Sequence, residues 1–365
     1  MKDFLLSICI PTFDRGEIVN RTVQNILKYM GDDIEVVVSD NCSTDNTAKL
    51  LNQIKDVRFK YYKNDYNNGG DNLISVLTYA SGDYRMLVSD EDDVDIKMIP
   101  KIIGIIKETT PGLMLTGVSV NKKRYVYNGY SNTEKGFAAL KKYGFGCTYM
   151  SGYIYDGSIL DRIFDGFTGT SVNKRYGYMY NFTNLARRTL QYGNYVTIEE
   201  MFIKHREDGK RDINTHTSNG KMVYSPECKI DCLFEAVREL KNMQLSDVEK
   251  MYLIRSYMHR IILRRHISDY NDSFNRNLIK EIELEGATFI CKYYLDNRNE
   301  IIGIKWIIRY LRNLKVCIRK IDELKIFDES YVKLIFKYNG ELKEIDKMNM
   351  NRLKKFWISK KINEL

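Results

Sequence analysis

The sequence predicts an α/β fold on a mostly parallel sheet, followed by a helical C-terminal region. In the first 120 residues, short apolar or β-branched runs alternate with segments in which apolar residues recur at helical spacing. Strands that alternate with helices pair in parallel through right-handed crossovers. From about residue 233 the pattern changes to long helices.

Each strand is predicted where an apolar run ends in polar or turn-forming residues. Strands are expected over 5–10, 34–38, 57–62, 84–88 and 113–120, with helices over 17–30, 47–54, 71–80 and 96–107. Pro11 is expected to end the first strand. Residues 121–232 are rich in Tyr and Gly, contain a strand-like patch at 149–155, and are expected to complete the sheet.

Composition excludes several classes of protein. The chain of 365 residues has no apolar run near the roughly 18 residues of a membrane span. Its start has an acid at position 3 and too short an apolar core for a secretory signal, so we expect a cytoplasmic protein. Seven scattered cysteines without CxxC favour a reducing compartment over a disulfide framework.

The net charge is confined to one part of the chain. Residues 1–240 carry 31 basic and 31 acidic side chains, so the whole excess of +9 lies in residues 241–365. No zinc-finger or RNA-recognition signature accompanies it, and we expect no nucleic acid partner.

Three polar clusters follow predicted strands, at 11–15, 40–47 and 90–93. In open parallel sheets, ligands bind beyond the carboxyl ends of the strands. The three clusters are therefore predicted to line one rim and to form a ligand site.

The residues themselves leave the chemistry of this rim open. Four successive carboxylates at 90–93 suit a divalent cation that also binds a diphosphate, or they form an acidic turn that caps the next helix. Asp40 suits a nucleoside contact or an N-cap, and Asn67–Gly70 suits a ligand-binding backbone or a plain turn. The absence of GxGxxG and of GxxxxGK[ST] disfavours nicotinamide, flavin and P-loop enzymes.

Four segments, in order and spacing, resemble family 2 glycosyltransferases with the GT-A fold: SICIPTFDR, EVVVSDNCSTDNT, YNNGGDN and YRMLVSDEDD. The resemblance is close over about residues 4–120 and extends weakly to about 230. It implies an inverting transfer of a sugar from a nucleoside diphosphate sugar, often a UDP sugar, to an acceptor hydroxyl. It also implies Mn²⁺ or Mg²⁺ as cofactor.

The resemblance implies roles for individual residues. Pro11, Thr12 and Asp14 would surround the base and ribose, and Asp40 would bind the uracil or ribose. Asp90 and Asp92 would form the DxD element, with Asp90 toward the ribose and Asp92 on the metal, beside Asp93 as a supporting neighbour.

The chain departs from the family pattern in three places. Phe13-Asp14 replaces the usual Tyr-Asn, and the usual Arg near position 71 is missing, so Asn72 is taken as its substitute for nucleotide binding. The local acids Asp156, Asp161 and Asp165 form no adjacent pair that would mark the catalytic base, and Asp165 is the predicted base. Glu207 and Asp208 are adjacent, but they lie late, in a polar stretch that is typical of an exposed loop.

These observations predict two domains: a GT-A domain over 1–232, with a nucleotide-sugar half (1–120) and an acceptor half (121–232), and a basic helical region over 233–365. Residues 301–320 and 347–361 contain no acid, and their basic amphipathic pattern favours either peripheral contact with an anionic membrane or an oligomer interface. Cys228 and Cys232, with His205 and His216 upstream, are interpreted as buried thiols rather than a zinc site.

The sequence thus favours a glycosyltransferase that acts on a lipid-linked sugar or a growing cell-surface glycan. Two alternatives stay open: a sugar nucleotidyltransferase, and a non-catalytic membrane-associated scaffold that keeps the fold.

Overall fold

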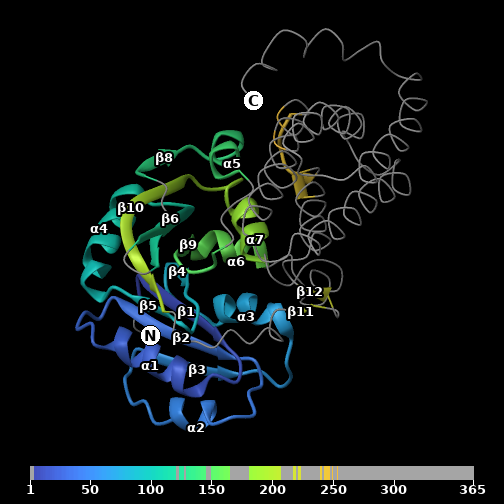
Figure 1. Ribbon diagram of the computed structural model, residues 1–365. Coiled ribbons are helices and arrows are strands. Elements are labelled where there is room, and N and C mark those ends of the chain that lie inside the picture. The colour runs from blue at the N-terminus through green and yellow to red at the C-terminus, as the bar shows by residue number, and fades with distance from the viewer. Residues whose placement is uncertain are drawn as a thin grey trace, which may run out of the picture. The chain divides into compact units, whose positions relative to one another are not determined.

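The computed structural model describes residues 4–120, 123–126, 129–144, 149–164 and 181–206, and short stretches between 217 and 253 (Figure 1). These residues belong to the unit Met1–Tyr257. The predicted boundary at 232/233 and nearly all of the predicted C-terminal helices lie outside the described residues.

The strands are β1 (Leu6–Thr12), β2 (Ile34–Asp40), β3 (Phe59–Lys63), β4 (Tyr84–Leu87), β5 (Asp92–Val94), β6 (Leu113–Val120), β7 (Lys123–Val126), β8 (Ser131–Thr133), β9 (Tyr153–Asp156), β10 (Tyr195–His205), β11 (Thr217–Ser218) and β12 (Lys221–Met222). The α-helices are α1 (Gly16–Leu27), α2 (Thr47–Leu51), α3 (Asn72–Tyr79), α4 (Ile99–Thr109), α5 (Phe137–Tyr143), α6 (Gly157–Phe164) and α7 (Asn181–Thr189). Two 3₁₀ turns, η1 (Gly69–Asp71) and η2 (Ile96–Met98), precede α3 and α4.

The main sheet has the order β3-β2-β1-β4-β9-β6-β10-β5, with β7 beside β6 and β8 beside β10. The first four strands of this order run parallel to one another, as do β6 and β10. β9 lies antiparallel between β4 and β6, and β5 pairs antiparallel with β10. The α/β prediction with mostly parallel strands is confirmed.

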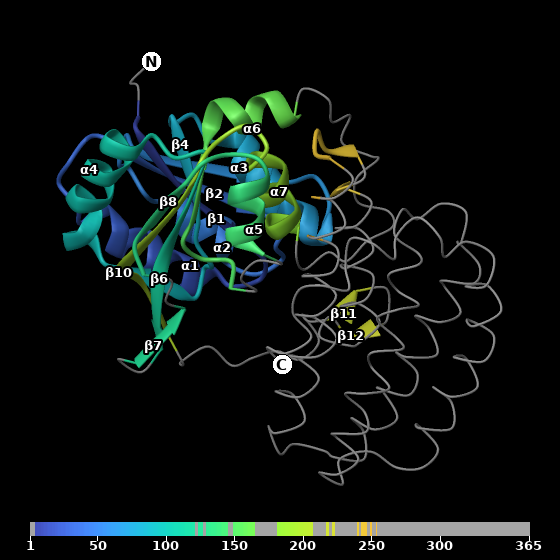
Figure 2. The same cartoon turned by 90° about the horizontal axis from the view of Figure 1, so that it is seen from above.

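Side chains alternate across the sheet because the strand period is two residues. One face packs Ile8, Ile10 and Met86 against apolar side chains of α1 and α4. The other face carries Tyr153 and Tyr155, whose rings meet α7: the Tyr155 hydroxyl donates to the Phe182 carbonyl at 2.8 Å. Figures 1 and 2 show helices on both sides of the sheet, so its rim, not its faces, is left for a ligand.

The expectation that Pro11 ends the first strand is wrong. β1 continues to Thr12, with Pro11 opposite Ser39. The Thr12 carbonyl accepts a hydrogen bond from the Asn41 N–H, so the backbone polar groups of Thr12 face β2. In a strand these groups point to opposite sides at successive residues, so Pro11, which has no N–H, faces β4. β4 pairs with β1 only as far as Cys9, so no ladder bond is lost at Pro11.

The acidic cluster 90–93 also differs from the simple acidic turn that was one of the two interpretations of the sequence. Asp92–Val94 forms strand β5, which pairs with the carboxyl end of β10. This pairing brings residues from two distant parts of the chain together at the rim. Among the described residues, no helix is long and apolar enough to cross a membrane.

Candidate functional site

The carboxyl ends of β1, β2 and β4 bring the three predicted polar clusters together. The register places Thr12 opposite Asp40, and the Thr12 hydroxyl donates to Asp90 Oδ2 at 2.8 Å. The predicted convergence of the clusters on one rim is therefore confirmed.

Asp40 is fully buried at the end of β2. Its Oδ1 accepts from the Ser43 backbone N–H at 2.8 Å, and its Oδ2 accepts from the Tyr61 hydroxyl at 2.7 Å. Burial, followed by this bond to Asp40, raises the pKa of Tyr61. Tyr61 therefore stays protonated and keeps donating to the carboxylate.

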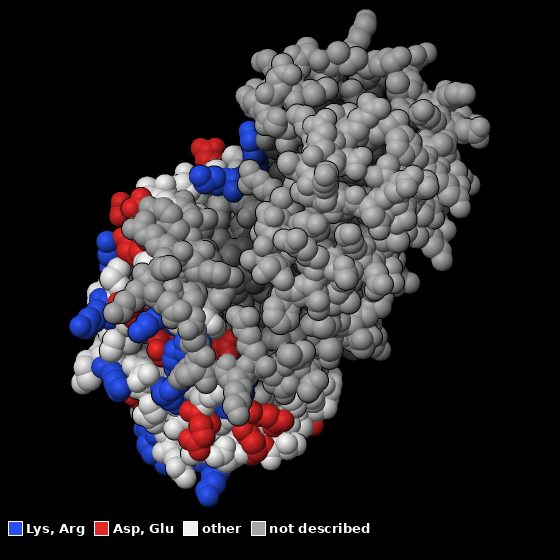
Figure 3. All heavy atoms as spheres, in the orientation of Figure 1, with Lys and Arg blue, Asp and Glu red and all other residues white. Residues whose placement is uncertain are grey.

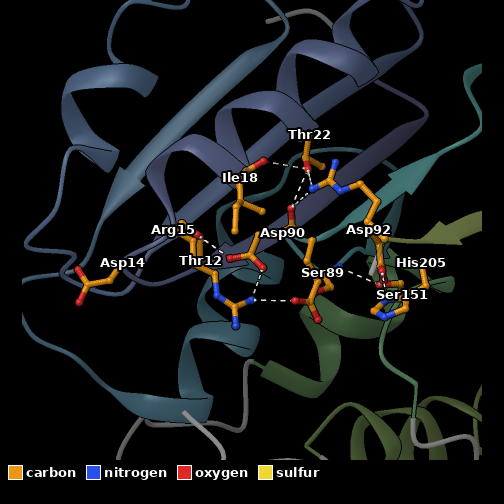
Figure 4. Close-up of polar contacts among 12 residues, drawn as sticks. Thr12, Asp14, Arg15, Ile18, Thr22, Ser89, Asp90, Asp92, Ser151 and His205 are labelled. Carbon is orange, nitrogen blue, oxygen red and sulfur yellow. Dashed lines mark hydrogen bonds and ion pairs between the residues drawn. The ribbon is translucent and has the colours of Figure 1, made fainter. Parts of the chain in front are cut away.

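Asp14 links two loops of the rim. Its φ of 49° is left-handed, a conformation that Asp and Asn adopt more readily than other non-glycine residues. Its N–H donates to Ser43 Oγ at 2.8 Å, and its Oδ1 accepts from the Thr44 N–H at 2.7 Å. The side chain is exposed and lies away from Asp90 in Figure 4.

Asn72 is buried where α3 begins, behind the rim. Its Nδ2 donates to the Ser39 carbonyl at 2.9 Å and more weakly to that of Thr12 at 3.3 Å. Its Oδ1 accepts from the Ser39 hydroxyl and from Asn64 Nδ2. This amide ties the ends of β1, β2 and β3 together.

Asp90 is held from the side of β1 and α1. Arg15 Nη1 lies 2.9 Å from its Oδ1 and 3.4 Å from Glu91 Oε2 (Figure 4). Burial raises the pKa of the Asp90 carboxyl, and the Arg15 guanidinium and the Thr12 hydroxyl offset part of that rise. The Arg15 cation beside this carboxylate disfavours a metal ion at the same oxygen.

The Asp90 backbone is also fixed. Its carbonyl accepts from the Thr22 hydroxyl at 2.7 Å and from Arg206 Nη2 at 3.1 Å. Arg206 Nη1 lies 2.6 Å from Asp93 Oδ1, so Asp93 supports the segment through an ion pair with the end of β10.

Asp92 faces different partners, from the side of β9 and β10. It is fully buried, and its Oδ2 accepts from the Ser151 hydroxyl at 2.5 Å. Its Oδ1 lies 2.7 Å from the Tyr149 hydroxyl and 2.9 Å from His205 Nδ1. Figure 4 shows Asp92, Ser151 and His205 together, apart from the group around Asp90.

Sequence reasoning did not find the partners of Asp92. His205 lies 113 positions from Asp92, and the sequence associates it only with Cys228 and Cys232. Tyr149 and Ser151 were assigned only to a strand-like patch. One signal is present: the apolar run Met201-Phe202-Ile203 is followed by the polar and charged stretch 204–212, which indicates that a strand ends near His205.

Asp92 and His205 place a carboxylate oxygen beside an imidazole nitrogen, two donor types that divalent cations accept. Oδ1 and Nδ1 are hydrogen-bonded to each other at 2.9 Å, so a cation bound by both atoms would replace this bond. Among the described residues, no three His, Cys, Asp or Glu side chains form a metal-binding group. Two protein ligands suffice for an ion that keeps waters and binds substrate phosphates.

The other candidates lie outside the described residues. These are the predicted base Asp165 and the cysteine–histidine group of Cys228, Cys232 and His216. On the visible face of the described part, basic and acidic side chains are interspersed (Figure 3), in line with the charge balance of residues 1–240.

The mostly parallel sheet with helices on both sides agrees with the GT-A fold that the resemblance implies. Solved structures agree: residues 1–349 of Staphylococcus aureus TarS match with a TM-score of 0.57 and 16% identity, covering 78% of this chain and 79% of that one. At this identity the likeness shows the fold alone.

Residues 7–166 match the family described as Glycosyl transferase family 2. A Campylobacter jejuni GalNAc(5)-diNAcBac-PP-undecaprenol beta-1,3-glucosyltransferase is 31% identical over 24% of this chain and 30% of its own length. The Escherichia coli UDP-Glc:alpha-D-GlcNAc-diphosphoundecaprenol beta-1,3-glucosyltransferase WfgD is 30% identical over 26% of this chain and 37% of its own length. The chain thus spans about a third of the length of such relatives.

Proposed function

We propose that the protein is an inverting glycosyltransferase that moves a sugar from a UDP sugar to an acceptor hydroxyl with the help of a divalent cation. The observation that carries this proposal is the buried Asp92 carboxylate, 2.9 Å from His205 at the carboxyl end of the sheet. The match of residues 7–166 to the glycosyltransferase family supports the reaction class. The relative WfgD, by its name, uses UDP-Glc, and TarS has been crystallised with UDP-GlcNAc.

The nucleoside would bind over the ends of β1 and β2. Pro11 and Thr12 form one wall of this position, and Asp40 with its Tyr61 partner lies under the other. Asp14 and Asn72 act through the loops that they connect, so we propose that they shape the nucleotide site. Asp90 would face the ribose, held in place by Arg15 and Thr12.

Asp92 and His205 would hold Mn²⁺ or Mg²⁺. When bound, such a cation supplies positive charge that stabilises the diphosphate as it leaves. The remaining work falls to the chain itself, which orients the carboxylate and the imidazole and keeps both largely out of bulk water.

The base stays assigned to Asp165. Two other acids weighed for this role have structural partners: Asp161 forms a two-bond ion pair with Arg85 at 2.6 and 2.9 Å, and Asp156 accepts from Ser158 and from the N–H of Ile159. An engaged carboxylate is poorly placed to take a proton from an acceptor hydroxyl.

We propose a lipid-linked sugar or a growing glycan as the acceptor, in line with the undecaprenol-linked substrates named for two relatives. A basic C-terminal region would hold the enzyme at the anionic membrane surface where such an acceptor lies.

The test is binding of UDP, GDP, CMP and ADP, each with and without Mn²⁺, by thermal shift and calorimetry. UDP is expected to raise the unfolding temperature of the wild type only with Mn²⁺, because a ligand that binds the native state stabilises it by mass action. Asp92→Asn should lose this response. Asp95→Asn, which alters a nearby acid that caps η2, should keep it.

Failure of every nucleotide to bind would contradict the proposed donor site and favour the scaffold alternative. The released product distinguishes the proposed function from the other alternative, a sugar nucleotidyltransferase. Sugar transfer releases UDP, whereas a nucleotidyltransferase releases pyrophosphate.

A further inference from the structure

Tyr149 and Ser151 lie in the segment that leads into β9, and both hydroxyls reach the buried Asp92 carboxylate. Ser151 donates to Oδ2 at 2.5 Å and Tyr149 donates to Oδ1 at 2.7 Å. Each carboxylate oxygen therefore has its own hydroxyl donor, which defines the orientation of the group.

The Ser151 hydroxyl is itself oriented. Its oxygen accepts from the Ser89 backbone N–H at 2.8 Å, so its own proton is directed to Asp92. Ser89 directly precedes the DxD segment. The chain Ser89–Ser151–Asp92 thus ties the carboxylate to the backbone of the same loop.

Tyr149 has a second contact in the site. Its hydroxyl lies 2.8 Å from His205 Nδ1, and the two rings meet edge-to-face with centroids 5.9 Å apart. One phenol therefore touches both Asp92 and His205, which are contributed by β5 and β10. Ser151 touches only Asp92 of this pair.

We propose that Tyr149 and Ser151 are positioning residues for the donor site, and that their hydroxyls fix the orientation in which Asp92 presents its carboxylate to a divalent cation. The proposal rests on the proposed function. Without the two hydroxyls, the carboxylate is free to rotate and its oxygens lose their preset direction. Groups that orient metal ligands typically contribute about 10–100-fold in metal affinity.

The experiment uses the full chain and measures Mn²⁺ binding in the presence of UDP, by calorimetry and by electron paramagnetic resonance of the free ion. Tyr149→Phe and Ser151→Ala are each expected to weaken Mn²⁺ binding by about 10–100-fold. Tyr143→Phe is the matched control, because it removes a buried phenol contact, 3.0 Å from the Tyr153 hydroxyl, outside this cluster. It should bind Mn²⁺ like the wild type.

A second measurement separates positioning from general loss of structure. The unfolding temperature of each variant is measured in EDTA and again with UDP and Mn²⁺. If the hydroxyls position Asp92, both variants should lose most of the rise in unfolding temperature that UDP and Mn²⁺ give the wild type. A purely structural defect would lower the unfolding temperature by the same amount in both conditions.

The outcomes are distinct. Wild-type binding of UDP and Mn²⁺, together with site variants that bind Mn²⁺ within about twofold of the wild type, would overturn the positioning role and leave the proposed function intact. A wild type that binds neither UDP nor Mn²⁺ would overturn both.

Discussion

At the scale of single residues, the rim is built from carboxylates that already have partners. Asp40, Asp90 and Asp92 are buried, and each accepts hydrogen bonds from side chains or backbone N–H groups of other segments. A buried carboxylate without such donors would cost several kcal/mol. These partners hold the three carboxyl groups in fixed orientations along the rim.

Tyr61 provides the residue-scale prediction. Tyr61→Phe should lower the free energy of unfolding by about 1–3 kcal/mol, because Asp40 Oδ2 loses its 2.7 Å donor while it stays buried. Chemical denaturation at pH 7 measures the change. Tyr62→Phe is the control, since Tyr62 is partly exposed and stacks on Tyr79. Equal stabilities for the two variants would contradict the role assigned to Tyr61.

At the scale of elements, Glu35 joins the amino ends of four strands. It is buried on β2, accepts from Ser7 on β1 at 2.6 Å and pairs with Lys60 on β3 at 2.7 Å. The Ser81 N–H, just before β4, donates to the same carboxylate at 2.6 Å. Burial alone would raise the pKa of Glu35, but the bonds from Lys60, Ser7 and Ser81 outweigh it and lower the pKa.

This shift predicts an acid dependence of stability. Because the pKa of Glu35 is lower in the folded than in the unfolded chain, its contribution is complete above the ordinary value of about 4.5 and is lost as pH falls through the folded value. Glu35→Gln should cost about 1–3 kcal/mol at pH 7 and flatten the loss of stability below pH 4.5. Denaturation curves from pH 7 to 3 test this, and an unchanged acid slope in the variant would count against it.

At the scale of the whole molecule, charge is divided along the chain. Residues 1–240 are neutral overall, and the excess of +9 lies beyond them. We expect the basic segments 301–320 and 347–361 to bind anionic membranes, since each Lys or Arg near such a surface is worth about 1 kcal/mol.

Vesicle co-sedimentation of the full chain tests this expectation. Binding to phosphatidylglycerol vesicles should exceed binding to phosphatidylcholine and fall with salt. Replacing Lys305, Arg309 and Arg312 by Gln should weaken binding by roughly 100-fold. The matched control replaces Lys107, Lys141 and Lys142, in the neutral part of the chain, and should change little. If both triple variants lost vesicle binding equally, the loss would reflect total charge alone, which would contradict a specific role of the segment 301–320.

The fold and the rim were predictable from local patterns, because apolar periodicity and turn residues report on neighbours in sequence. Four successive runs and their polar ends predicted β1 to β4 and the meeting of Thr12, Asp40 and Asp90. The continuation of β1 through Pro11 was not predictable, because it depends on where β4 stops pairing with β1.

Local patterns in the chain predict the strand–helix alternation, the acids at the strand ends and the family resemblance that residues 7–166 bear out. The side chains that hold Asp92 are known only from the folded arrangement. Its partners Tyr149, Ser151 and His205 lie 57, 59 and 113 positions away, and they meet it because β9 inserts antiparallel beside β4 and β5 pairs with the end of β10. Contacts at such separations depend on sheet order, which no local pattern of residues encodes.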